Sequence, residues 1–221
     1  MNFNKIKEAA GLNFETHIPE SISEDSPVLL MLHGYGSHEQ DLLGMAPLLP
    51  QPFLTISMQA PLELPLGGYA WYHLNFDEIG TKLSNVEQAN QSHEKMVKTI
   101  AAIKENFPKR ELWIMGFSQG CILSYSLVSK YPQYFKAMIG LSGYQLDEIT
   151  NWKSAEAYSN LKFFISHGTQ DPIIPVNLGE QAANGLKQVS ENVSFNTYEM
   201  GHGVDQNCFA DLQRWVSTNY S

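Results

Sequence analysis

Four short apolar segments constrain the fold of this chain more than any other feature. They are VLLMLH (28–33), LWIMGF (112–117), FKAMIGLS (135–142) and LKFFISH (161–167), each bounded by turn-forming or polar residues. Segments of this length that are apolar at nearly every position are typical of strands buried on both faces of a parallel sheet. FLTISM (53–58) indicates a fifth strand, and the less apolar VSFNTYEM (193–200) indicates a strand nearer an edge.

Helical periods fall between these segments. In the longest, apolar side chains recur every three or four residues from Val86 to Phe107, Ser84 and Glu87 form a capping-box pattern, and Pro108 marks the end. Further helices are expected over residues 119–130, 177–189 and 204–216. This alternation predicts an α/β fold, in which a mostly parallel central sheet carries helices on both faces and ligands bind beyond the carboxyl ends of the strands.

Composition favours one packed domain over residues 1–221, because 43% of the residues are hydrophobic and 17% are charged. The net charge of −9 comes without any Lys/Arg cluster, so nucleic acid is not an expected partner. The chain has neither a signal-peptide core nor a membrane-length apolar run, so we expect a cytoplasmic protein without stable membrane insertion. Cys121 and Cys208 are expected to be reduced, packed thiols, and no Cys/His spacing suggests a metal. The oligomeric state, monomer or homodimer, stays open.

The stretch from Gln59 to Leu83 interrupts the alternation. It lacks a clean period, contains several Pro and Gly residues, and carries the aromatic sequence YAWYHLNF. Loops of this length are uncommon unless they are functional. Two interpretations remain open: a surface loop pinned by aromatic rings, or the wall or partial lid of an acyl pocket.

The pentapeptide GFSQG (116–120) identifies Ser118 as a candidate nucleophile. It follows a buried strand and precedes a helix that starts near Gln119, which is the order of a nucleophile elbow. Gly116 and Gly120 suit a turn too cramped for side chains. The pattern alone is short enough to arise by chance, and a serine hydroxyl needs a positioned base.

His202 in GHGV and Asp171 in HGTQDPIIP supply the candidate base and acid. Each follows a strand, and the chain order Ser118, Asp171, His202 is the order in which this fold class presents its triad. His202 would take the proton of Ser118, and Asp171 would fix the imidazole tautomer. Activity is then expected to fall at acid pH as the base becomes protonated.

Three other residues compete for these roles. His33 and His167 also end strands and precede glycines, but their places in the chain favour turn-forming or loop-supporting roles. Asp205 lies three residues from His202 and is a less favoured triad acid.

Two backbone NH groups are candidates for an oxyanion hole. The NH of Gln119 lies at a helix N-terminus, where the helix dipole favours negative charge. The segment HGYGS (33–37) follows an early strand, and its glycines Gly34 and Gly36 permit a tight turn that directs the Tyr35 NH inward. The alternative is a glycine-rich connection with no catalytic part.

Taken together, these motifs resemble the phospholipase/carboxylesterase family of α/β-hydrolases, which includes small carboxylesterases and acyl-protein thioesterases. The similarity spans residues 27–215 and is carried by LHGYGSHEQDL, GFSQG, LSGYQL, HGTQDPIIPV and GHGV. The resemblance implies the α/β-hydrolase fold, the triad and oxyanion donors named above, and hydrolysis of carboxylic ester or thioester bonds without a cofactor. GGYAWYHLNF (67–76) resembles the family's aromatic active-site loop, which makes Trp71 and Tyr72 candidate substrate contacts.

The sequence departs from the family pattern at two positions. Cys121 stands where a further glycine often follows SQG, and Tyr35 stands where a smaller aliphatic residue is frequent, so its ring could shrink the acyl site. The expected function is a serine esterase acting on small or medium acyl esters. An acyl-thioesterase or lysophospholipase on the same triad is the alternative, and a non-catalytic binding protein with this fold is the competing class.

Overall fold

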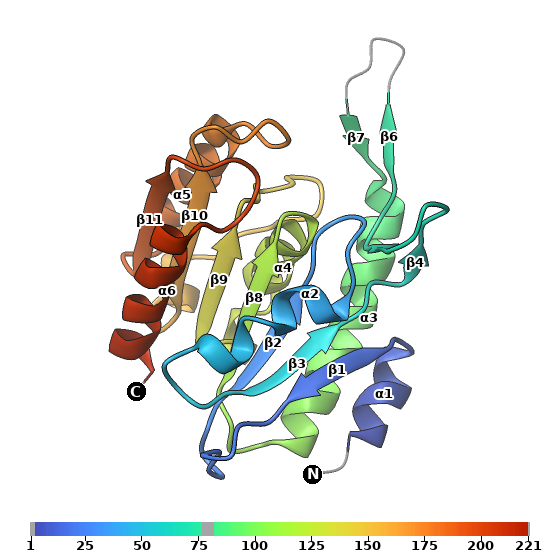
Figure 1. The fold of residues 1–221 in the computed structure, drawn as a ribbon, viewed down its shortest axis with the longest axis vertical. Coiled ribbons are helices and arrows are strands. Elements are labelled where there is room, and N and C mark those ends of the chain that lie inside the picture. The colour runs from blue at the N-terminus through green and yellow to red at the C-terminus, as the bar shows by residue number, and fades with distance from the viewer. Residues whose placement is uncertain (1–2, 77–81, 221) are drawn as a thin grey trace.

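A computed structural model describes residues 3–76 and 82–220. Its strands in the main sheet are β1 (Phe14–His17), β2 (Val28–Leu32), β3 (Leu54–Met58), β8 (Leu112–Phe117), β9 (Ala137–Leu141), β10 (Lys162–Gly168) and β11 (Val193–Tyr198). They form a seven-stranded sheet in the order β1-β3-β2-β8-β9-β10-β11 (Figure 1). All neighbours are parallel except β1, which pairs antiparallel with β3.

The six expected strands are all present. Every residue of β2, β3 and β9 is buried, which explains their uniformly apolar sequences. β11 is only half-buried for most of its length and lies at the sheet edge, as its mixed sequence predicted. β1 was not predicted, because FETH is short and lacks a buried apolar run.

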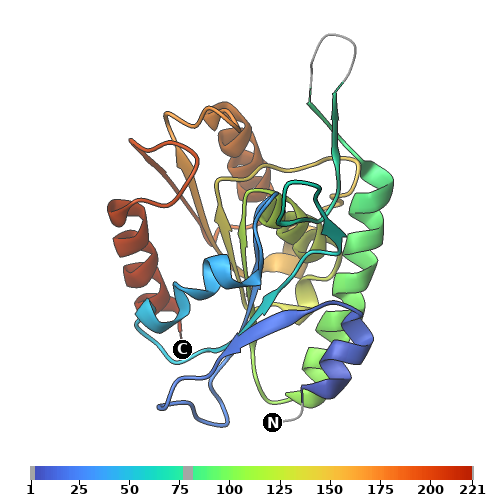
Figure 2. The same cartoon turned by 45° about the vertical axis from the view of Figure 1, so that its right-hand side comes forward.

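Helices cover both faces of the sheet (Figures 1 and 2). They are α1 (Asn4–Ala10), α2 (Glu39–Leu43), α3 (Val86–Asn106), α4 (Gln119–Lys130), α5 (Val176–Val189) and α6 (Gln206–Asn219), with short 3-10 helices η1 (Ala46–Leu48), η2 (Pro132–Tyr134) and η3 (Ala155–Tyr158). One apolar core joins α1, α3, α4 and α5 to one sheet face, and a second joins α2 and α6 to the other. Successive strand residues such as Leu29 and Leu30 belong to opposite cores, as the strand period requires.

Two helix starts differ from expectation. The predicted capping box of Ser84 and Glu87 is wrong: Asn85 is the N-cap of α3, and its side-chain oxygen accepts the Gln88 NH at 3.1 Å. Ser84 instead ends a strand. α6 begins at Gln206 rather than near residue 204, because the Asp205 carboxylate caps it by accepting a backbone NH.

The stretch 59–83 contains two small hairpins rather than a plain loop. β4 (Leu62–Glu63) pairs with β5 (Tyr69–Ala70), and β6 (Leu74–Phe76) pairs with β7 (Lys82–Ser84). The β6–β7 pair extends past the carboxyl ends of the central strands (Figures 1 and 2). Residues 77–81, on which part of the lid interpretation depended, lie outside the described residues.

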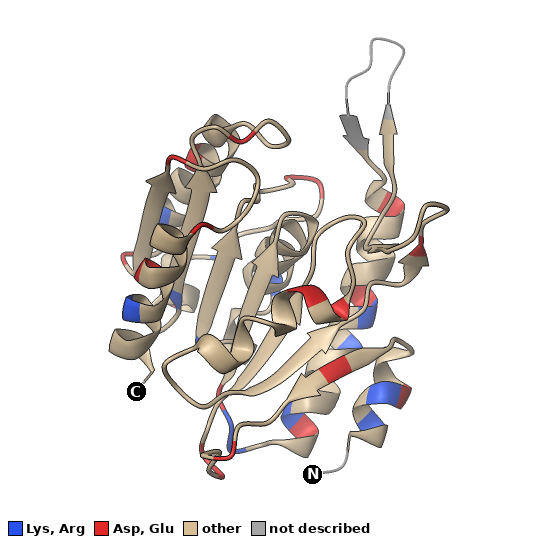
Figure 3. Cartoon of the chain, in the orientation of Figure 1, with Lys and Arg blue, Asp and Glu red and all other residues tan. Residues whose placement is uncertain are grey.

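Charged side chains are distributed over many elements, with Lys and Arg on several helices rather than gathered on one (Figure 3). Within residues 3–76 and 82–220, no helix combines the length and apolar character needed to span a bilayer.

Candidate active site

Ser118 occupies a sharp turn between β8 and α4. Its backbone angles are φ 52° and ψ −115°, a conformation that residues with a side chain rarely adopt. The surrounding hydrogen bonds hold it: the Ser118 NH donates to the Leu141 carbonyl at 2.9 Å, and its carbonyl accepts the Ile122 NH at 3.0 Å. The turn is therefore fixed from both its strand and its helix side.

The flanking glycines are required by close backbone contacts. A Cβ on Gly116 would lie 2.4 Å from the Gly120 carbonyl oxygen, and a Cβ on Gly120 would lie 2.0 Å from the Leu32 carbonyl oxygen. Both contacts are with backbone, which cannot move aside as a flexible side chain could. The cramped turn inferred from GFSQG is present.

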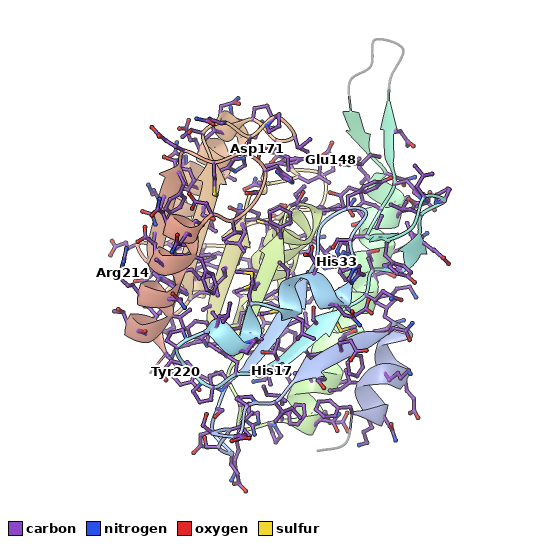
Figure 4. The ribbon with its side chains drawn as sticks, in the orientation of Figure 1. His17, His33, Glu148, Asp171, Arg214 and Tyr220 are labelled. Carbon is purple, nitrogen blue, oxygen red and sulfur yellow. The ribbon has the colours of Figure 1, made fainter. Side chains whose placement is uncertain are left out.

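The three residues predicted as a triad form one hydrogen-bonded chain. His202 Nε2 lies 2.9 Å from Ser118 Oγ, and His202 Nδ1 lies 2.7 Å from Asp171 Oδ2. The second carboxylate oxygen of Asp171 accepts the backbone NH groups of Ile173 and Ile174 at 2.8 and 2.9 Å. Figure 4 shows Asp171 beyond the carboxyl ends of the parallel strands, where the sheet topology places ligand sites.

The environment of Asp171 keeps its carboxylate ionised. Burial is the largest influence and raises its pKa, but the hydrogen bonds from His202 and from the Ile174 and Ile173 NH groups together lower the pKa below its ordinary value. An ionised Asp171 requires His202 Nδ1 to carry the proton that it donates. The Nε2 lone pair then faces the Ser118 hydroxyl and can accept its proton.

The proposed oxyanion donors lie on segments that meet beside Ser118. Gln119 is the first residue of α4, so its NH has no partner within the helix. A Cβ on Gly34 would lie 3.3 Å from Ser118 Cβ, which places the 33–37 segment against the nucleophile. Gly36, at φ 79°, donates its NH to the Tyr69 carbonyl, and the Tyr35 side chain between these glycines remains 42% exposed.

His33 supports this loop rather than reacting. Its Nδ1 lies 2.8 Å from the Gly34 carbonyl oxygen and therefore donates, and its Nε2 accepts the Ala60 NH at 3.0 Å. Burial lowers the pKa of His33, which favours the neutral ring that this pattern needs. The loop-supporting interpretation agrees with these contacts.

His167 and Asp205 are also placed away from the proton path. His167 Nε2 lies 2.8 Å from the Ile174 carbonyl oxygen and 3.4 Å from Asp171 Oδ2, so it supports the turn that carries Asp171. The Asp205 carboxylate caps α6 by accepting the Cys208 NH at 2.7 Å. Asp171, and not Asp205, bonds the imidazole of His202.

A pocket of about 350 Å³ opens over Ser118. Its lining is mainly apolar and aromatic and includes both Ser118 and His202: the lining residues are Tyr35, Tyr72, Leu74, Ser118, Gln119, Ile122, Tyr144, Ile173, Ile174 and His202. The sequence analysis identified Tyr72 as a candidate substrate contact. It did not identify Leu74, Ile122, Tyr144, Ile173 or Ile174. The motifs LSGYQL and HGTQDPIIPV contained three of these residues, since they hold Tyr144 and the isoleucine pair.

Trp71 does not belong to this lining, although the sequence made it a candidate substrate contact. Its side chain is fully buried, and its indole NH donates to the His33 carbonyl at 2.9 Å. Tyr72 is equally buried and packs in the same apolar core, but it lies among the residues that line the pocket.

Comparison with known proteins gives the family of the chain. Residues 14–220 match the model of the phospholipase/carboxylesterase family. Acyl-protein thioesterase 1 of Candida albicans is 26% identical over 226 residues, covering 90% of this chain and 94% of that protein. Acyl-protein thioesterase 1 of Emericella nidulans is 29% identical over 181 residues, covering 75% of this chain and 72% of that protein.

Solved structures share the fold at low sequence identity. The Bacillus cereus carboxylesterase has a TM-score of 0.84 at 17% identity, with 100% of both chains covered. Zea mays acyl-protein thioesterase 2 has a TM-score of 0.74 at 20% identity, covering 94% of this chain and 99% of that chain. Because the family model spans nearly the whole chain and these structures share its architecture, the chain belongs to the phospholipase/carboxylesterase family of ester hydrolases with the α/β-hydrolase fold.

Proposed function

We propose that this chain is a serine esterase that hydrolyses small or medium acyl esters through Ser118, His202 and Asp171. One observation carries the proposal: an unbroken hydrogen-bonded chain runs from a buried carboxylate through an imidazole to a serine hydroxyl that faces an apolar pocket. Nucleophile, base and orienting acid in this geometry are the requirements of nucleophilic acyl transfer.

In the first half-reaction, Ser118 Oγ attacks the acyl carbonyl carbon while His202 Nε2 takes the hydroxyl proton. The imidazolium that forms is stabilised by the Asp171 carboxylate at Nδ1. The tetrahedral intermediate carries its negative charge on the former carbonyl oxygen, where the NH groups of Gln119 and Tyr35 would donate. His202 returns the proton to the leaving alcohol, and Ser118 is left acylated.

In the second half-reaction, water repeats the sequence. His202 accepts a proton from water, the hydroxide oxygen attacks the acyl-enzyme carbonyl, and the same NH groups bear the oxyanion. Collapse of this intermediate releases the carboxylic acid and returns the proton to Ser118 Oγ. None of these steps requires a cofactor.

The pocket supports acyl groups of modest size, because its volume of about 350 Å³ lies at the small end of ligand pockets. Tyr35 is one of the residues that line it. Thioesters or lysophospholipids would use the same triad. The thioester alternative is supported by the Candida albicans and Emericella nidulans relatives, which are both named acyl-protein thioesterase 1.

The test is replacement of Ser118 with Ala. Hydrolysis of p-nitrophenyl acetate and butyrate should be lost while the circular dichroism spectrum and melting temperature are retained. A fluorophosphonate probe should label the wild-type chain and not the variant. Equal hydrolysis by both proteins would reject Ser118 as nucleophile, and an unlabelled, inactive wild-type protein would favour the binding-protein class.

A series of acyl chains from acetyl to palmitoyl, prepared as oxygen esters and as thioesters, separates the substrate alternatives. A maximum of kcat/KM at short or medium oxygen esters supports the main proposal. A consistent preference for thioesters, or for palmitoyl groups, would favour the alternative.

A cytoplasmic location remains part of the proposal. Cys121 and Cys208 are both free thiols, which is the usual state in a reducing compartment. Fractionation of cells that produce the protein tests this location directly.

A further inference from the structure

The side chain of Gln119 makes two hydrogen bonds to the pocket wall that are separate from any role of its backbone NH. Its Oε1 accepts the Trp71 NH at 2.8 Å, and its Nε2 donates to the Tyr72 carbonyl at 2.7 Å. Gln119 is 3% exposed, so both bonds lie in the protein interior. One side-chain amide therefore bonds backbone groups of two consecutive residues of the pocket wall, Trp71 and Tyr72, to the residue that follows the nucleophile.

Both partners are satisfied only by a side chain of this length that carries one acceptor and one donor, as the Gln119 amide does. A backbone NH is always a donor and a carbonyl oxygen always an acceptor, so the orientation of the Gln119 amide is fixed. A carboxylate could accept the Trp71 NH but could not donate to the Tyr72 carbonyl. An apolar side chain would leave both peptide groups buried without a partner.

Trp71 also makes hydrogen bonds to two other parts of the chain. The Trp71 carbonyl accepts the Ser92 hydroxyl of α3, and the Trp71 indole NH donates to the His33 carbonyl at the base of the 33–37 segment. Tyr72, the next residue, lines the acyl pocket. We call the segment Trp71–Tyr72, which carries this lining residue, the Tyr72 wall. The Gln119 side chain joins it directly to the nucleophile elbow and so holds it at a fixed distance from Ser118.

We propose that the Gln119 side-chain amide is a positioning group that sets acyl-chain selectivity by holding the Tyr72 wall against the nucleophile elbow. The expected change in selectivity rests on the proposed esterase function. The two hydrogen bonds of the Gln119 side chain can be tested without measuring catalysis. Loss of the amide would let the wall shift, while Ser118, His202 and the Gln119 backbone NH remain in the chain.

The kinetic test compares Gln119→Met with the wild-type protein on p-nitrophenyl acetate and hexanoate. The measured quantity is the ratio of the two kcat/KM values. We expect this ratio to change by at least about fivefold, since single methylene groups in a pocket are discriminated by roughly tenfold or more. Equal losses on both substrates would mean a general defect and would overturn the proposal.

Gln119→Glu adds a readout that a purely structural role would not move. The protonated acid keeps one acceptor and one donor and can replace the amide, whereas the carboxylate cannot donate to Tyr72. Burial raises the pKa of such a carboxyl group above about 4.3. The selectivity ratio should match wild type near pH 5 and approach that of Gln119→Met near pH 8. Protonation of His202 cancels in the ratio, because both substrates use it.

Hydrogen exchange of the backbone tests these two hydrogen bonds independently of catalysis. In Gln119→Met, the peptide covering residues 69–73 should exchange faster than in wild type, while peptides from β8 and β9 stay unchanged. The control is Gln213→Met, which removes an exposed hydrogen bond from a side-chain amide of α6 to the Leu48 carbonyl and should change neither readout. Unchanged exchange at 69–73 would overturn the proposal even if the protein hydrolysed no ester, whereas faster exchange without ester hydrolysis would reject only the proposed function.

Discussion

Asp171 and His202 share a 2.7 Å hydrogen bond in which the carboxylate is fully buried and the imidazole is only 17% exposed. The two carboxylate oxygens have different partners, because Oδ1 accepts two backbone NH groups and Oδ2 accepts His202. This division fixes the rotation of the carboxylate about its Cβ–Cγ bond. The residue is thereby held in the orientation that selects one imidazole tautomer.

Replacement of Asp171 with Asn should reverse that tautomer. The backbone NH groups of Ile173 and Ile174 require an acceptor, so the amide oxygen would take the Oδ1 position and the amide nitrogen would face His202. His202 Nδ1 would then accept, and Nε2 would carry a proton and could not serve as base. We expect kcat on p-nitrophenyl acetate to fall by about 10³–10⁴-fold. A loss below tenfold would contradict the assigned role.

Asp171 should also contribute a pH-dependent part of the stability. Its pKa is lowered in the folded state, so its contribution is present above the unfolded value of about 3.9 and is lost as pH falls through the folded value. The difference in unfolding free energy between wild type and Asp171→Asn should therefore be larger at pH 6 than at pH 3. Urea unfolding at both pH values measures it. A difference that grew on acidification would show that the carboxylate is not stabilised in its ionised form.

Much of the fold could be predicted because its signals are local. Strands β2, β8 and β9 are buried on both faces, so their sequences had to be apolar throughout, and the helices between them keep a clear period. α1 and β1 escaped prediction because they are short and contribute few buried side chains; only Ile6 and Ala10 are buried in α1. The start of α3 was misplaced because Ser84 and Asn85 are both good caps, and the backbone path favours Asn85.

The candidate site was predictable where a residue type and its position at a strand end carry the chemistry, as for Ser118, Asp171 and His202. Contacts between segments that are distant in the sequence could not be predicted. Trp71 and Tyr72 are equivalent as adjacent aromatics in the sequence and are both buried in the same apolar core, and only the path of the segment brings Tyr72, and not Trp71, to the pocket lining. The bonds from Gln119 to this segment span more than forty residues and leave no local pattern.

The elbow glycines should tolerate no side chain. Gly120→Ala would place a Cβ 2.0 Å from the Leu32 carbonyl oxygen, and we expect a loss of about 1–3 kcal/mol in the free energy of unfolding. Gly185, within α5, is the matched control, because a Cβ there would meet only the Gln145 side-chain oxygen at 3.5 Å. Gly185→Ala should stabilise the protein by about 0.5–1 kcal/mol. Denaturant unfolding measures both, and similar stabilities for the two variants would argue against a crowded elbow.

Both cysteines should be unreactive in the native protein. Burial raises the pKa of Cys121 far above its usual range and that of Cys208 to about 11, so neither forms much thiolate near neutral pH. Both side chains are also fully buried. With 5,5′-dithiobis(2-nitrobenzoate) at pH 8, we expect no fast release of thiolate from the folded chain and two equivalents per chain after unfolding in guanidinium chloride, one for each cysteine. Fast reaction of one equivalent before unfolding would place that thiol at the surface, and single Cys→Ser variants would identify which one.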